Sequence, residues 1–151
     1  MPNKKNRKKK QAARSGGAAA VHTPVPVETV LQLALSGQRS QLEQLLANGS
    51  INDVNGANAD GYTALLAACQ GGHKDLAQLL VSAGASVDQA KNDGATPLFI
   101  TCQHGHKDVA QLLLSARASM DLAQNTGATP LYIACQEGHK DVAQLLLSAG
   151  A

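Results

Sequence analysis

The chain has 151 residues, a length typical of one domain with a sizeable core. It contains no Trp, one Phe and two Tyr, so its core must be built from aliphatic side chains. That composition favours packed helices over an aromatic-rich β-sandwich. No stretch has the length and apolar character of a membrane span or a secretory signal, and the three cysteines suit a reducing environment. We therefore expect an intracellular protein.

Residues 1–26 are predicted to form a disordered basic arm, because few of their side chains could bury an apolar face. The arm holds seven of the thirteen basic residues of a chain whose formal net charge is +2. These residues are Lys4, Lys5, Arg7, Lys8, Lys9, Lys10 and Arg14. The arm could be a solvated leader, or it could bind a nuclear import factor, nucleic acid or an acidic membrane surface. These alternatives stay open. We expect the protein to be located in the cytoplasm or the nucleus.

From residue 60 the sequence repeats with a period of 33 residues. The segments 60–92, 93–125 and 126–151 align without gaps, and the last of them is incomplete at its end. Strong internal identity at a fixed period of this length indicates a solenoid, in which each unit packs on its neighbours.

The middle unit predicts a turn followed by two antiparallel helices. Asp93-Gly94 suits a tight turn, and Thr96, followed by a proline, can cap a helix. This helix should end near His104, where Gly105 can adopt the left-handed conformation. The segment from His106 to Ser115 carries apolar residues at i, i+3 and i+4, which predicts a second helix.

The motifs D-G-x-T-P-L, A-C-Q-x-G-H and V-A-Q-L-L-L-x-x-G-A resemble the ankyrin repeat over residues 60–151. The resemblance implies an all-α solenoid of stacked helix-turn-helix units joined by β-turn loops. It also indicates that residues 27–59 form a polar-faced first repeat that caps the array. The predicted repeat domain therefore covers residues 27–151.

Two departures from the family pattern affect the expected packing. The family usually has a histidine after T-P-L, but this chain has Leu66, Phe99 and Tyr132 there. We therefore expect the polar network between repeats to be largely absent, with apolar packing in its place. Arg117 stands where other units have a glycine after the second helix, so the third unit is expected to be strained.

The stretch Cys102-Gln-His-Gly-His-Lys-Asp places a thiol and an imidazole four residues apart, a spacing that could bind a metal on a continuous helix. Gly105 interrupts that helix, and the same pair recurs around Cys69 and Cys135. Repetition favours packing cysteines over a metal site, and no unique catalytic constellation is present. We predict no metal, no cofactor and no enzymatic activity.

The resemblance implies protein binding through a concave face made of turn tips and exposed first-helix positions. The candidate partner-binding residues, which match surface positions of the family pattern, are Tyr62, Asn92, Gln103, His104, Asn125, Gln136 and Glu137. The predicted function is that of a non-catalytic scaffold that binds a protein partner.

Two alternatives to this function stay open, together with a possible self-association. The chain could be the recognition part of a larger or truncated protein whose activity lies beyond residue 151. It could be a nuclear or nucleic-acid-associated protein that acts through the basic arm. The apolar end at residues 145–151 could also support self-association.

Overall fold

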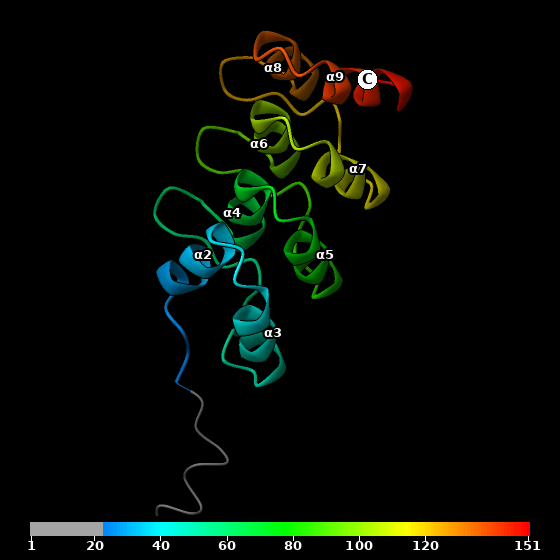
Figure 1. The fold of residues 1–151 in the computed structure, drawn as a ribbon. Coiled ribbons are helices and arrows are strands. Elements are labelled where there is room, and N and C mark those ends of the chain that lie inside the picture. The colour runs from blue at the N-terminus through cyan, green and yellow to red at the C-terminus, as the bar shows by residue number, and fades with distance from the viewer. Residues whose placement is uncertain (1–22) are drawn as a thin grey trace, which may run out of the picture.

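The computed structural model describes residues 23–151, so the seven basic residues of the predicted arm lie outside the described residues. Within residues 23–151 the chain forms eight helices and no strand, arranged as four antiparallel pairs (Figure 1). The pairs are α2 (Val27–Leu35) with α3 (Arg39–Ala47), α4 (Ala64–Gly71) with α5 (Lys74–Ser82), α6 (Pro97–His104) with α7 (Lys107–Ser115), and α8 (Pro130–Gln136) with α9 (Lys140–Ser148). The prediction of an all-helical ankyrin-type solenoid is confirmed.

The boundaries of α6 follow from its capping residues. The hydroxyl of Thr96 accepts a hydrogen bond from the main-chain N–H of Phe99 at 3.2 Å, and Pro97 takes the first helical position. Gly105 ends the helix in the left-handed conformation, with φ of 73°. The predicted turn, cap and helix break of this unit are therefore confirmed.

The first helices stack in one layer and the second helices in another (Figure 1). In α4 six consecutive residues, from Ala64 to Cys69, are buried. They are covered on one side by α2, on the other by α6, and from behind by α5. The second helices bury only one face each, as α5 does with Leu76, Ala77 and Leu80. The core therefore runs between the layers along the whole array.

A polar ladder joins consecutive pairs, so the expectation that the polar network between repeats would be largely absent was wrong. The Nε2 atoms of His73, His106 and His139 lie 2.9, 3.0 and 3.1 Å from main-chain carbonyl oxygens of the preceding pair. Because a carbonyl oxygen can only accept, each Nε2 carries the proton and donates it. The accepting carbonyls belong to Leu35, Gln70 and Gln103, near the C-terminal ends of first helices. These carbonyls lack a helical partner, and the imidazoles supply one.

The turns form a second ladder through their asparagines. The side-chain amide of Asn92 donates to the carbonyl of Ala59 at 2.8 Å, and that of Asn125 donates to the carbonyl of Asn92 at 3.2 Å. The main-chain N–H of each asparagine also donates to the preceding turn. The turns are thereby held in a fixed register along the array.

Arg117 is the one residue other than glycine in residues 23–151 with a positive φ, 64°. The corresponding Gly84 and Gly150 have φ values of 94° and 101°. A side chain in this region is strained, because its Cβ crowds the main chain. The expected strain in the third unit is therefore present.

Arg117→Gly should raise the free energy of unfolding by about 1 kcal/mol, since glycine removes the Cβ strain. Arg117→Ala, the control, keeps that strain and should change stability little. Urea denaturation of both variants measures the effect. An Arg117→Gly variant no more stable than Arg117→Ala would contradict the assignment.

His106→Ala should lower the free energy of unfolding by about 1–2 kcal/mol, because the carbonyl of Gln70 loses its donor. The neighbouring His104 bonds only within its own helix, so His104→Ala should cost less than about 0.5 kcal/mol. Denaturation curves for the two variants provide the comparison. Equal losses of stability in the two variants would show that the hydrogen bond from His106 to Gln70 contributes nothing to the free energy of unfolding.

Candidate functional site

A hollow of about 510 Å³ opens between α6, α8 and the turn that precedes α8. It lies on the side of the array formed by the first helices and the turns. Its main side chains are those of Gln103, Gln124, Thr126, Tyr132, Ile133 and Gln136. No charged side chain of residues 23–151 lines this hollow, which instead combines three carboxamides with the aromatic rings of Tyr132 and Phe99 and the aliphatic side chain of Ile133.

Two of the predicted partner-binding residues, Gln103 and Gln136, meet in this hollow. Both are exposed and come from equivalent positions of α6 and α8. Tyr132 was not among the predicted residues, although it lines the same hollow and is 59% exposed. The equivalent Phe99 is only 3% exposed, because α8 packs over α6. The same sequence position is therefore core in one unit and surface in the next.

His104 and Glu137 are both exposed and stand where α6 and α8 end. The Nδ1 atom of His104 donates to the carbonyl of Ile100 at 2.9 Å, which folds the ring back onto its own helix. The ring also stacks on that of His106, with centroids 6.0 Å apart. His104 is consequently a fixed surface group, and Glu137 adds a carboxylate at the equivalent position.

A family model described as "Ankyrin repeats (3 copies)" matches residues 11–91 and 84–151. The chain belongs to the ankyrin repeat family. Ankyrin repeats are generally protein-protein interaction modules, and the family is generally non-catalytic. A search of curated proteins found no match to the chain. None of the helices in residues 23–151 is long and apolar enough to cross a membrane.

Three further predicted partner-binding residues of this ankyrin array, Tyr62, Asn92 and Asn125, lie outside the hollow. Tyr62 is half-buried, and its hydroxyl bonds to the side-chain oxygen of Gln70. Burial, with a smaller contribution from the nearby Cys69 thiol, raises the pKa of Tyr62. Asn92 and Asn125 are exposed, but their amides donate to neighbouring turns. The structure therefore gives these three residues structural contacts within the array.

Asp93, a charged residue on the turn before α6, contacts Gln124, which lines the hollow. Asp93 accepts hydrogen bonds from Lys91 Nζ at 2.8 Å, from the main chain of Ala95 at 2.9 Å and from Gln124 Nε2 at 3.2 Å. Partial burial pulls its pKa upward, but these donors outweigh that effect and lower the pKa. The next unit has the neutral Thr126 at this position, which leaves the turn beside the hollow uncharged.

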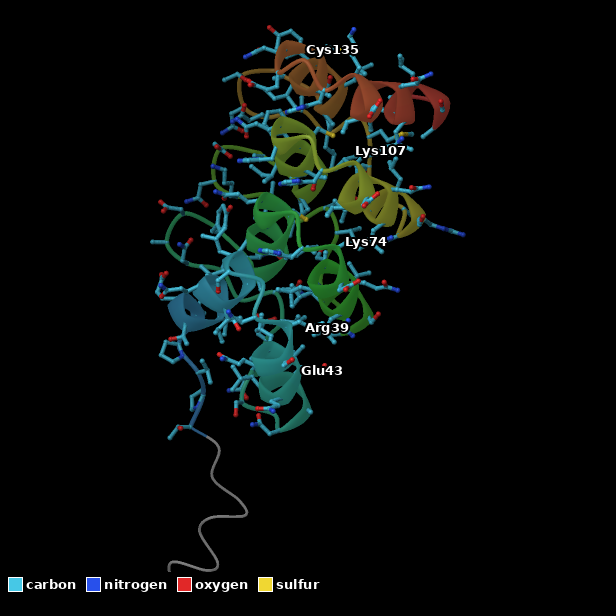
Figure 2. The ribbon with its side chains drawn as sticks, in the orientation of Figure 1. Arg39, Glu43, Lys74, Lys107 and Cys135 are labelled. Carbon is cyan, nitrogen blue, oxygen red and sulfur yellow. The ribbon has the colours of Figure 1, made fainter. Side chains whose placement is uncertain are left out.

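The three cysteines of the ankyrin array are free thiols with different exposure. Cys69 and Cys102 are buried as predicted, and burial raises the pKa of each to about 12. Cys135 is exposed, which differs from the prediction, because no helix of residues 23–151 covers the corresponding side of α8 (Figure 2). No cluster of three metal-binding side chains occurs in the described part of the chain.

Only Cys135 should react quickly with a thiol reagent in the native protein at neutral pH. The thiolate is the reactive form, and both burial and a high pKa suppress it at Cys69 and Cys102. Mass spectrometry after timed alkylation should show one fast label, and two more only after unfolding. Fast labelling that survives in a Cys135→Ser variant would contradict the burial of the other two.

Proposed function

We propose that the protein binds a protein partner through the hollow between α6 and α8 and the first-helix surface around it. The proposal rests on one observation. Gln103 and Gln136 are exposed carboxamides that line the same uncharged hollow, beside the ring of Tyr132. The family as a whole supports this class of function.

The chemistry of the hollow suits a polypeptide segment in extended conformation. A carboxamide both donates and accepts, so Gln103, Gln124 and Gln136 can pair with the N–H and C=O groups of a partner's main chain. Tyr132 adds apolar contact area together with a hydroxyl, the combination that is enriched at protein interfaces. A segment without charge at its centre fits best, because the side chains that line the hollow in the described part of the chain offer no counterion.

The scaffold keeps the entropic cost of binding low. Gln103 and Gln136 stand on helices, and the neighbouring turn is fixed by Asn125 and by the hydrogen bond from Gln124 to Asp93. Groups held on rigid elements lose little conformational freedom when a partner binds. His104 and Glu137 can extend the contact at the helix ends, and Tyr62 and Asn92 can extend it along the array.

The setting that we propose is intracellular. All three cysteines are unpaired, and two of them are held as buried thiols. Thiols persist in compartments that are kept reducing, whereas secreted domains generally use their cysteines in disulfides.

The double variant Gln103→Glu and Gln136→Glu should weaken partner capture at least about tenfold, because carboxylates keep the shape of the side chain but cannot donate. The matched control is Gln111→Glu with Gln144→Glu, which places the same charges at exposed positions of α7 and α9. Quantitative pull-downs from cell extract compare both variants with the unmodified protein. Equal capture by all three would overturn the proposed surface.

A further inference from the structure

A row of glutamines at equivalent positions crosses the first helices. Gln70, Gln103 and Gln136 each directly follow the cysteine of their unit, near the C-terminal ends of α4, α6 and α8. These helices stack directly on one another in a single layer (Figure 1). We call the three glutamines the carboxamide row. It extends the surface of Gln103 and Gln136, which line the hollow, by one unit toward the N-terminus.

The main chain of the carboxamide row is held in register by the histidine bonds. The carbonyls of Gln70 and Gln103 accept from His106 and His139 at 3.0 and 3.1 Å. Each bond fixes the position of one glutamine relative to the helix pair that follows it. Because the axes of packed helices lie about 8–10 Å apart, the row presents one carboxamide per interval of this length.

The contact between Tyr62 and Gln70 determines which group of that carboxamide faces a partner. The hydroxyl of Tyr62 donates to the Oε1 atom of Gln70, which holds the side-chain oxygen against the array. The Nε2 group, with its two N–H donors, is left for an outside partner. A partner at Gln70 must therefore present an acceptor, and every residue of a polypeptide carries one in its main-chain carbonyl.

The spacing of the carboxamide row selects one extended conformation. A polyproline II helix has three residues per turn and rises about 3.1 Å per residue, so equivalent groups recur about every 9 Å and face the same side. In a β-strand successive residues alternate, so groups three residues apart face opposite sides. Polyproline II also leaves its main-chain carbonyls without internal hydrogen bonds. The carbonyls of residues i, i+3 and i+6 of such a segment therefore match the three glutamines in spacing and in chemistry.

The surface beside the carboxamide row suits proline better than a charged residue. One helical turn before each glutamine stand Leu66, Phe99 and Tyr132, and none of these side chains carries a charge. Tyr132 is exposed and lines the hollow together with Ile133. Segments in the polyproline II conformation dock on aromatic surfaces of this kind. Complementarity of charge therefore favours an uncharged, proline-rich segment.

We propose that the carboxamide row binds an uncharged, proline-rich segment of a partner protein in the polyproline II conformation, whose carbonyls at every third residue accept from Gln70, Gln103 and Gln136. The inference rests on the proposed function, because it uses the same surface, and it adds Gln70 and the conformation of the partner. In the first unit the equivalent residue is Leu35, so the row has three donors within residues 23–151. A partner segment of about seven residues spans them.

The test measures the binding of capped, fluorescently labelled (Pro-Pro-Ala)n peptides to the full chain by fluorescence anisotropy. The nine-residue peptide should bind saturably and about fivefold more tightly than the six-residue peptide, which reaches only two glutamines. The twelve-residue peptide should gain at most about twofold more, because it meets no further glutamine. The flexible peptide (Gly-Ser-Ala)3 should bind at least about tenfold more weakly than the nine-residue peptide, since it loses more conformational freedom. No saturable binding of the nine-residue peptide, or equal binding of (Gly-Ser-Ala)3, would overturn the proposal.

Matched variants of the full chain separate this inference from the proposed function. Gln70→Leu removes the donor that lies outside the hollow, so the nine-residue peptide should bind this variant about fivefold more weakly. The control Gln78→Leu makes the same change at an exposed position of α5 and should leave binding intact. Equal binding to these two variants would overturn the inference. Capture of a partner protein that is lost with Gln103→Glu and Gln136→Glu, but kept in full with Gln70→Leu, would also overturn it and would leave the proposed function standing.

Discussion

The structure depends on the stacking of one helix pair on the next. A single pair of short helices cannot bury its apolar surface, and helices of seven to nine residues are too short to be stable alone in water. In α4 burial is complete from Ala64 to Cys69 because neighbours cover it on both sides. Small side chains such as Ala67 and Ala68 let those neighbours approach closely. The stability of the array therefore comes mainly from the junctions, which are the contacts between consecutive helix pairs, and less from the contacts within each pair.

The junctions also fix the geometry of the surface. Apolar packing alone permits small shifts between layers, whereas each bond from His73, His106 or His139 to a carbonyl sets one position along the helix. The asparagine ladder does the same for the turns. Gln103 and Gln136 then stand at equivalent positions of neighbouring units, which is how a repeating core yields a defined hollow.

Local signals in the sequence were enough to predict the helices. Thr96 and Gly105 identify the limits of α6 because a cap and a helix break depend on the nearest residues. The role of His106 was missed, since its partner Gln70 lies 36 residues earlier, although a Gly-His pair at every period was a signal. The exposure of Tyr132 and Cys135 could not be predicted from their own sequence, because it depends on what stacks against α8. The hollow also depends on how two units pack together. Of the residues that line it, only Gln103 and Gln136 were therefore predicted as binding residues.

The central claim, that the junctions supply the stability of the array, can be tested directly by native-state hydrogen exchange. Main-chain amides of α4 and α6, whose helices have neighbours on both sides, should exchange most slowly. Amides of α8 and α9 should exchange faster, because residues 23–151 leave one side of this pair uncovered and Leu147 is exposed. Protection in α8 equal to that in α6 would contradict the account, since the capping signals Thr96 and Thr129 are the same in both units.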